Sequence, residues 1–249
     1  MLRLVLVFIY FLPGCIYSQN IHVFYDTDLM DDIKKPVAVS FLKGALISNQ
    51  KESLYYTLPK DTLVAYDGGE YFVEFEETPD FDLNKVTGDK MYKNISERYC
   101  MFQYFFGSKK TIIKDDEYNI KNWEITKNTR TILGYSCQEA VCSFRGRNYK
   151  AYFTSELPYS NGPFKFDGLP GLILEIISDD QTVHIYATEI KYTDLEISNP
   201  YSNEKKVTSW DDFKKEWKKL YDKQNSYYRT QGAEEDIFPN RQIEYYITD

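Results

Sequence analysis

Histidine is scarce in this sequence, and its scarcity limits the chemistry that the protein can perform. His22 and His184 are the only two histidines. The sequence contains no Gly-x-Ser-x-Gly segment for a nucleophilic serine, and no His-Glu-x-x-His segment or closely spaced cysteine pair for zinc. Each histidine is therefore interpreted as a strand residue and not as a general base. The sequence predicts no catalytic residue, no metal site and no cofactor.

Glycine-rich loops and long apolar runs are also missing. Gly162, Gly168 and Gly171 are separated by proline and aromatic residues and lead into a strand, whereas a phosphate-binding loop opens a helix. Beyond the first 19 residues, no apolar run approaches the ~20 residues of a membrane helix. The mature chain is therefore expected to lack a transmembrane span.

The chain has no excess of positive charge. It carries 38 acidic against 30 basic residues, a formal net charge of -8. Such a surface argues against nucleic acid as a partner and against electrostatic attachment to anionic lipid.

Aromatic residues are abundant, with 23 Tyr and 16 Phe. Because these side chains suit half-buried pleated surfaces, they predict a β-rich fold. An aromatic-lined groove for sugar, peptide or lipid is the alternative interpretation.

The first 19 residues resemble a secretory signal peptide. A short apolar run at 2–12 follows Arg3 and precedes small and polar residues. Cleavage near Ser18 or Gln19 is favoured, while the segment 12–15 offers an alternative in which Cys15 carries a lipid anchor. We expect an exported protein, periplasmic or associated with the outer membrane. Residues 20–249 show no internal repeat or low-complexity linker and are predicted to form one domain.

Strand signals follow one another closely, separated by turn residues, and this favours an antiparallel meander. One helix is expected at 210–225, where Ser209 can cap the first turn and Trp210, Phe213 and Trp217 share one face. The strands are expected at 21–25, 45–49, 53–57, 71–76, 90–94, 99–106, 111–114, 123–126, 131–144, 149–154, 172–177 and 183–192, with a possible edge strand at 242–247.

The segment 168–173 has the sequence Gly-Leu-Pro-Gly-Leu-Ile. Proline followed by glycine suits a type II turn over 169–172, from which a strand leaves. With the flanking segments 132–140, 144–147 and 149–154, it resembles the GLPGLI family over a block of about 123–177. This resemblance implies an exported protein of Bacteroidota bacteria, in a family with no established activity.

Three cysteines remain beyond the leader: Cys100, Cys137 and Cys142. An exported protein can join two of them in a disulfide. Cys137 and Cys142 would lie about 16 Å apart on opposite faces of one extended strand, too far to pair. Cys100 is thus the expected partner of one of them, and the resemblance to the GLPGLI family, which similarly carries a cysteine at position 137, points to Cys137.

Two features suggest a binding site. Arg145 and Arg147 project from a hairpin turn and suit a carboxylate or phosphate ligand, or alternatively a structural salt bridge to Asp167 or Glu175. The loop at 158–171 carries apolar side chains that can cover one end of a curved sheet or leave a groove. The candidate ligand-binding side chains in and after this loop are Phe164, Phe166, Leu169 and Leu172.

These observations predict a mainly β (α+β) fold: a single curved antiparallel sheet, a half-barrel similar to periplasmic lipoprotein carriers, with one C-terminal amphipathic helix packed on it. That likeness is an analogy of fold and by itself assigns no function. The leading hypothesis is a non-enzymatic binding or carrier protein for a hydrophobic or peptide-like ligand. The alternatives are a hydrolase of envelope sugars or peptides that uses Glu156, Asp167 or Glu175, and an interaction partner of an outer-membrane transporter.

Overall fold

The computed structural model describes residues 19–30, 39–57, 89–106, 108–118, 120–232 and 243–244. The predicted leader, with Cys15, and the predicted strand at 71–76 lie outside these residues. So does most of the predicted edge strand at 242–247.

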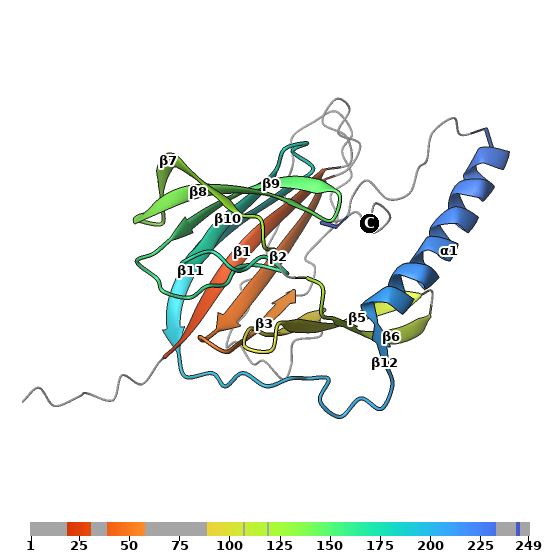
Figure 1. Ribbon diagram of the computed structural model, residues 1–249, viewed down its shortest axis with the longest axis horizontal. Helices are drawn as coiled ribbons and strands as arrows, with labels where there is room; N and C mark the ends of the chain where they lie inside the picture. The colour runs from red at the N-terminus through yellow and green to blue at the C-terminus, as the bar shows by residue number, and fades with distance from the viewer. Residues whose placement is uncertain are drawn as a thin grey trace, which may run out of the picture.

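Within these ranges, twelve strands form one sheet, and a helix follows the last strand (Figure 1). The elements are β1 (Asn20–Met30), β2 (Val39–Ser48), β3 (Glu52–Thr57), β4 (Lys90–Asn94), β5 (Tyr99–Phe106), β6 (Lys109–Asp115), β7 (Glu124–Ile132), β8 (Tyr135–Phe144), β9 (Arg147–Thr154), β10 (Leu172–Ser178), β11 (Val183–Thr193), β12 (Val207–Ser209) and α1 (Trp210–Thr230).

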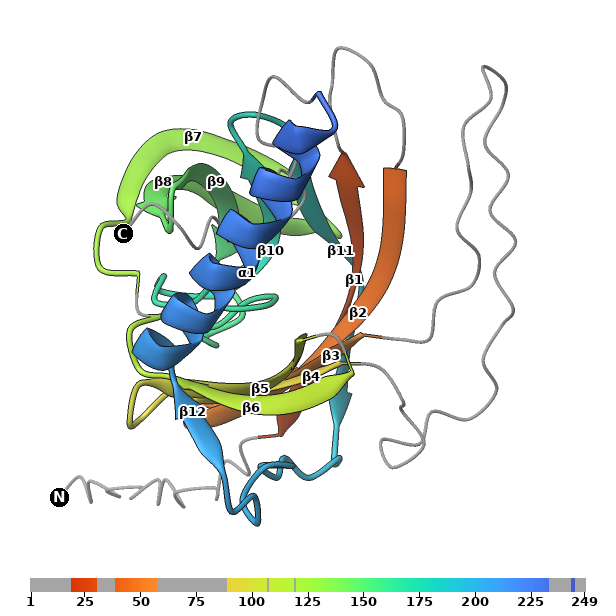
Figure 2. The same cartoon turned by 90° about the vertical axis from the view of Figure 1, so that its right-hand side faces the viewer.

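The sheet consists of two meanders joined side by side. Its order is β12-β6-β5-β4-β3-β2-β1-β11-β10-β9-β8-β7, so β1 pairs with both β2 and β11. Figure 2 shows the sheet curving toward one side, with α1 in front of that concave side. We call the concave side of this sheet the bowl. The predicted fold, a single curved and mostly antiparallel sheet with one C-terminal helix, is confirmed, although β12 pairs with β6 in parallel.

One predicted strand is in fact a hairpin. The segment 131–144 contains the turn Leu133-Gly134, where φ is 49° and 84°, and it divides β7 from β8. Arg145 and Gly146 make an equivalent turn between β8 and β9, with φ of 45° and 79°. Two successive residues with positive φ are typical of the two-residue turns that match strand twist. A leucine at such a position is uncommon, so the local sequence did not indicate the first turn.

The main hydrophobic core fills the bowl. Alternate residues of β1 point inward, among them Ile21, Val23 and Tyr25, all fully buried. The loop between β9 and β10 folds into the same space through Leu157, Phe166 and Leu169; we call residues 155–171 the cover loop. Its burial makes the loop part of the core and not an external flap.

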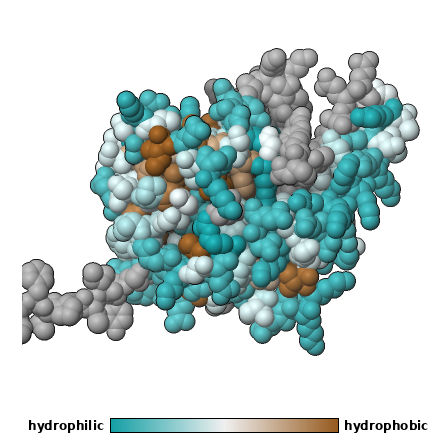
Figure 3. Space-filling model, in the orientation of Figure 1, coloured by the Kyte–Doolittle hydropathy of each residue, from teal (hydrophilic) through white to brown (hydrophobic). Residues whose placement is uncertain are grey.

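The helix closes part of the open side. Ser209 caps it by accepting a hydrogen bond from the backbone N–H of Asp212, as predicted, although α1 continues to Thr230 and not only to 225. Trp210, Phe213 and Trp217 are buried, and the rings of Trp210 and Phe213 pack against Phe102 of β5. The visible outer side of α1 is hydrophilic (Figure 3), which is consistent with an amphipathic helix.

The cysteines do not form the expected disulfide in this structure. Cys100, Cys137 and Cys142 are buried free thiols. Cys100 lies near Asp115 and Lys165, whereas Cys137 lies near Arg130 and Glu156. The proposed pairing of Cys100 with Cys137 is therefore wrong here, because the sheet places the two residues in different surroundings. Burial raises the pKa of all three thiols, that of Cys142 to about 12.

The Leu-Pro-Gly bend has different hydrogen bonds from those predicted. The N–H of Gly171 donates to the carbonyl of Leu169 at 2.8 Å, a three-residue turn, and the N–H of Leu172 donates to Leu157 at 3.0 Å. A Cβ atom added to Gly171 would lie 2.1 Å from the backbone oxygen of Thr154. Glycine is therefore required here to let the bend press against the end of β9.

Replacing Gly171 by alanine should destabilise the fold by at least about 2 kcal/mol, because the backbone of Thr154 must move. Gly134→Ala is the matched control, since its φ is 84° but, among the described residues, no atom beyond its two chain neighbours lies within 4 Å of the added Cβ. The control should cost about 1 kcal/mol from backbone strain alone. Urea unfolding measures both, and equal losses would contradict the steric explanation.

His22 has an unusual environment for a histidine. Its Nε2 atom lies 2.7 Å from the hydroxyl of Tyr56. Burial first, and then the nearby Lys191, lowers the pKa of His22 from 6.5 to about 4. Between these values the unfolded chain binds more protons at this position than the folded chain. The stabilising contribution is therefore present above pH 6.5 and is lost as the pH falls through 4.

With two histidines in the chain, an NMR titration can follow each imidazole. One resonance should titrate near pH 4, and it should disappear in His22→Gln, whose amide can still bond to Tyr56. The stability of the wild type should also fall more steeply than that of the variant between pH 6.5 and 5. A His22 resonance that titrates above pH 6 would contradict the assignment.

Candidate functional site

A cavity of about 220 Å³ opens into the bowl between β1–β5 and the cover loop. The first five strands provide most of its wall, and Phe164 and Ile243 complete it. The lining residues are Thr27, Leu42, Tyr55, Thr57, Asp89, Lys90, Met91, Phe102, Gln103, Tyr104, Phe164 and Ile243. We call this space the bowl cavity.

The lining of the bowl cavity is chiefly apolar and aromatic. Tyr55, Phe102 and Tyr104 present rings from β3 and β5, while Asp89 and Lys90 add charge where β4 begins. Ligand pockets for drug-sized molecules are typically ~300 Å³ or more. The bowl cavity is smaller, and its size suits one large apolar side chain.

Gly44 allows Tyr55 to lie where it does. A Cβ atom on Gly44 would lie 2.1 Å from the Tyr55 hydroxyl oxygen. Burial raises the pKa of Tyr55 to about 12, so the hydroxyl stays neutral at physiological pH. The ring therefore serves as an apolar wall with one fixed polar atom.

The predicted ligand-binding residues in the cover loop and directly after it divide into two groups. Phe164 lines the bowl cavity, at a φ of 51°. Phe166, Leu169 and Leu172 are buried in the hydrophobic core and are not among the lining residues. Phe164 therefore contacts the cavity, whereas the buried side chains of Phe166 and Leu169 anchor the loop in the hydrophobic core.

Beside the cavity lies a ring of four buried charges: Asp115, Arg145, Lys165 and Glu244. Arg145 donates to both oxygens of Asp115 at 2.7 and 2.8 Å and to Glu244 at 2.8 Å. Lys165 donates to Asp115 at 2.9 Å and to Glu244 at 2.7 Å. We call these four residues the charge ring. Two cations and two carboxylates balance, as buried charges must.

An aromatic ring supports both cations. The guanidinium carbon of Arg145 lies 3.8 Å from the ring centre of Trp210, and the Lys165 ammonium lies 4.4 Å from it. Burial alone would raise the pKa of Asp115, but Lys165 and Arg145 hold that pKa below its ordinary value. The ring is thus a set of true ion pairs.

The two arginines of the β8–β9 hairpin do form salt bridges, but not with the predicted partners. Arg145 pairs with Asp115 and Glu244, and the Nε atom of Arg147 lies 2.8 Å from Asp180. Asp167 and Glu175 were the wrong partners because the hairpin turn points toward the end of β6 and not toward these residues. Both arginines therefore form structural salt bridges. Arg145 also lies near the bowl cavity, because its partner Glu244 follows Ile243, which lines the cavity.

Asp167 belongs to a separate buried group. Arg98 lies 3.9 Å from it, and burial raises the pKa of Asp167. Nearby, the buried Lys93 donates to the side chain of Asn161 and to the Gly162 carbonyl, the latter at 3.1 Å. Burial lowers the pKa of Lys93 to about 8. This group fastens the cover loop to β4.

Glu175 and His184 lie on the outer face of the sheet. The Nε2 atom of His184 is 2.7 Å from Glu175 and its Nδ1 atom is 3.9 Å from Asp28, and Arg130 also contacts Glu175. The side chain of His184 is 37% exposed. Burial lowers the pKa of His184, which favours the neutral imidazole.

The three carboxylates suggested for hydrolysis are held by different partners. Glu156 accepts the backbone N–H of Ser136 at 2.9 Å, Asp167 faces Arg98, and Glu175 faces His184. A glycosidase needs two carboxyl groups that flank one bond. Among the described residues, these three carboxylates contact different partners.

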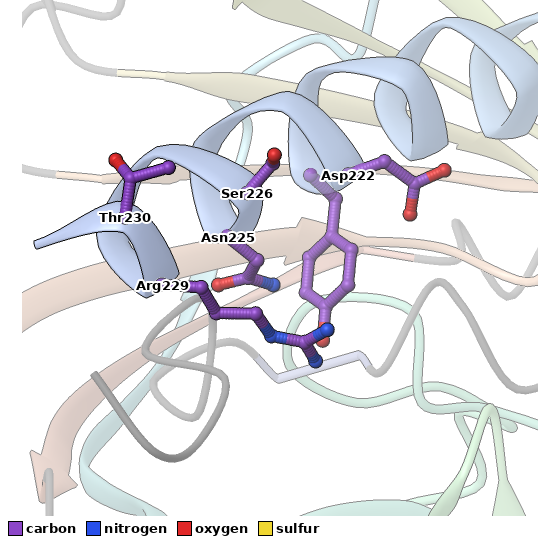
Figure 4. Close-up of a pocket in the computed structure, with 6 residues that line it drawn as sticks. Asp222, Asn225, Ser226, Arg229 and Thr230 are labelled. Atoms are coloured by element: carbon purple, nitrogen blue, oxygen red, sulfur yellow. The ribbon is translucent and has the colours of Figure 1, made fainter. Parts of the chain in front are cut away.

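A second hollow, of about 510 Å³, lies along the last turns of α1 (Figure 4). Figure 4 shows Asn225 and Arg229 extending from the same side of the helix. All the lining residues that the structure describes come from α1 itself: Tyr221, Asp222, Asn225, Ser226, Arg229 and Thr230. A hollow with one polar helical wall defines no ligand.

Within the described ranges, no group of three or more His, Cys, Asp or Glu side chains could hold a metal ion. In the same ranges, no helix is both long and apolar enough to cross a membrane.

Several residues of the site were not singled out from the sequence. Phe102 and Tyr104 could have been found, because they alternate along one predicted strand and therefore share a face. Asp115, Lys165 and Glu244 could not, since the ion pair between Arg145 and Glu244 joins residues 99 positions apart.

The chain is similar to known proteins. A model of the family described as N-glycanase peptide, N-terminal domain, matches residues 77–214, more than half of the chain. Two solved structures of PNGF-II, in the P21 and C2 space groups, each align over 77% of this chain with 18% identity and a TM-score of 0.49. The chain spans 32% and 31% of the length of those proteins. No curated protein matches it.

The charge ring predicts a large cost for removing one member. Arg145→Met should destabilise the protein by about 3 to 5 kcal/mol, because two buried carboxylates then face one cation. Lys218→Met is the control, since Lys218 forms an exposed pair with Asp222 at 3.0 Å, and it should cost less than about 1 kcal/mol. Urea unfolding with unchanged m-values measures both. A loss below 1 kcal/mol for Arg145→Met would show that the ring contributes little.

Proposed function

The chain belongs to the family described as N-glycanase peptide, N-terminal domain, and from that premise we propose that it is a non-catalytic binding domain. Its ligand is an apolar or peptide-like group held in the bowl cavity. The observation that supports this proposal is an open space in the bowl with a chiefly apolar lining that includes four aromatic side chains.

The composition of the wall supports an apolar side chain as the occupant. Tyr55, Met91, Phe102 and Phe164 offer rings and a thioether, which adapt to apolar shapes. Asp89 and Lys90 add polar groups that can fix the backbone of a ligand. Burying such a side chain provides about 1.5 to 3 kcal/mol, so the affinity of a short peptide should be modest.

The hydrolase alternative has weaker support. The described carboxylates Glu156, Asp167 and Glu175 have separate partners, and Asp167 is buried. The third alternative, docking on an outer-membrane transporter, would use an exposed surface and has no specific observation in its favour.

Export and GLPGLI membership belong to the same proposal. The apolar leader at 1–19 supports export to the periplasm or the outer membrane, with Cys15 as a possible acylation site. The Gly-Leu-Pro-Gly-Leu-Ile segment supports the resemblance to GLPGLI proteins. Mass spectrometry of the mature N-terminus would distinguish lipidation at Cys15 from cleavage near residue 19.

Binding can be measured with small capped probes. N-acetyl-phenylalaninamide and N-acetyl-leucinamide should shift the NMR resonances of cavity residues, whereas N-acetyl-serinamide and N,N′-diacetylchitobiose should not. Leu42→Trp should weaken binding of the apolar probes by about tenfold or more, because the indole fills a space of this size.

Ile125→Trp is the matched control, since Ile125 lies on the edge strand β7 and is exposed. It should bind the probes as the wild type does. Equal binding by both tryptophan variants would place the ligand elsewhere. A preference for the sugar would replace the apolar ligand with a glycan.

A further inference from the structure

The last described residues, Ile243 and Glu244, occupy the bowl as a bound peptide would. Ile243 forms part of the wall of the bowl cavity. The Tyr149 hydroxyl donates to the backbone carbonyl of Ile243. Glu244 is fully buried between two cations. The bowl therefore contacts the side chain of Ile243, its backbone carbonyl and the carboxylate of Glu244.

The charge ring without Glu244 is not neutral. Arg145 and Lys165 carry two positive charges, and Asp115 supplies one negative charge. A buried surplus of positive charge is costly unless a carboxylate balances it. The three residues contributed by β6, the β8–β9 turn and the cover loop thus form a site that requires an anion.

The geometry of Glu244 specifies a carboxylate. Its Oε1 atom accepts from Arg145 at 2.8 Å and its Oε2 atom accepts from Lys165 at 2.7 Å. Both oxygens are needed as acceptors, so an amide in the same place would direct its NH₂ group at a cation. Glutamine should therefore be rejected strongly, although it has the same shape.

We propose that the bowl is a receptor for a linear peptide in which an apolar residue is followed by glutamate, and that Ile243–Glu244 occupies this receptor in cis. An external peptide of the same pattern competes with these two residues for the charge ring and for the position of Ile243 at the wall of the bowl cavity. The apolar half of this inference rests on the proposed function, whereas the carboxylate half rests on the charge ring alone.

The probe is a fluorescein-labelled peptide with the sequence of residues 241–249. The receptor is the full-length chain carrying Ile243→Ala and Glu244→Gln, which weakens the cis contact. Fluorescence anisotropy should show that the peptide binds this variant at least about tenfold more tightly than the wild type, in which the site is occupied. The same peptide carrying Glu244→Gln should bind the variant at least about tenfold more weakly than the unmodified peptide.

Glu204→Gln is the control variant of the receptor, because Glu204 forms an exposed pair with Lys110 at 3.8 Å. It should behave as the wild type. Circular dichroism and urea unfolding check that the double variant is folded. If it is not, Ile243→Ala alone keeps the charge ring intact and should still bind the peptide more tightly than the wild type.

Two results would overturn the inference. One is equal affinity of the folded receptor for the glutamate and glutamine peptides. The other is no binding of the peptide by either receptor variant.

The outcomes also separate this inference from the proposed function. If capped phenylalanine binds the wild type in a manner that depends on Leu42 while the peptide fails, only the inference is lost. The peptide can also bind through its carboxylate while Leu42→Trp in the double-variant receptor has no effect. In that case the bowl cavity does not bind the apolar residue, but the charge ring still binds the glutamate.

Discussion

The charge ring is the interaction on which the arrangement of this molecule depends. Asp115 ends β6, Arg145 lies in the β8–β9 turn, Lys165 lies in the cover loop and Glu244 follows α1 in the chain. Four segments that are distant in sequence are thus joined by short ion pairs beneath Trp210. Because buried charges must balance, no one segment can leave without exposing the others to a large electrostatic cost.

The curved sheet creates the space that the charge ring occupies. Pairing of β1 with β11 joins two meanders into one sheet, and its curvature gives the core a single concave side. The cover loop and the first half of α1 fill most of this side. The part that they leave open, next to Phe164, is the bowl cavity.

The apolar cavity and the balanced charge ring lie next to each other, so the proposed peptide site combines two kinds of contact. Apolar contact provides binding energy with little direction, while ion pairs impose geometry and reject uncharged analogues. In our proposal these two contributions together select the peptide. Such a role is compatible with a family whose description ties it to an N-glycanase as an N-terminal domain.

The sequence by itself determined the local features. The positions of β4 and β5, Ser209 as a helix cap and the Pro170-Gly171 bend depend on neighbouring residues, and each was found within a few positions of where the structure has it. The turn at Leu133 was missed, because a leucine with positive φ carries no local signal. Only the tertiary structure decided the partners of Arg145, the separation of Cys100 from Cys137 and the burial of Phe166 in the core. The reason is physical: ion pairs and core contacts join residues far apart in the chain, and their cost or benefit depends on burial, which no short window of sequence records.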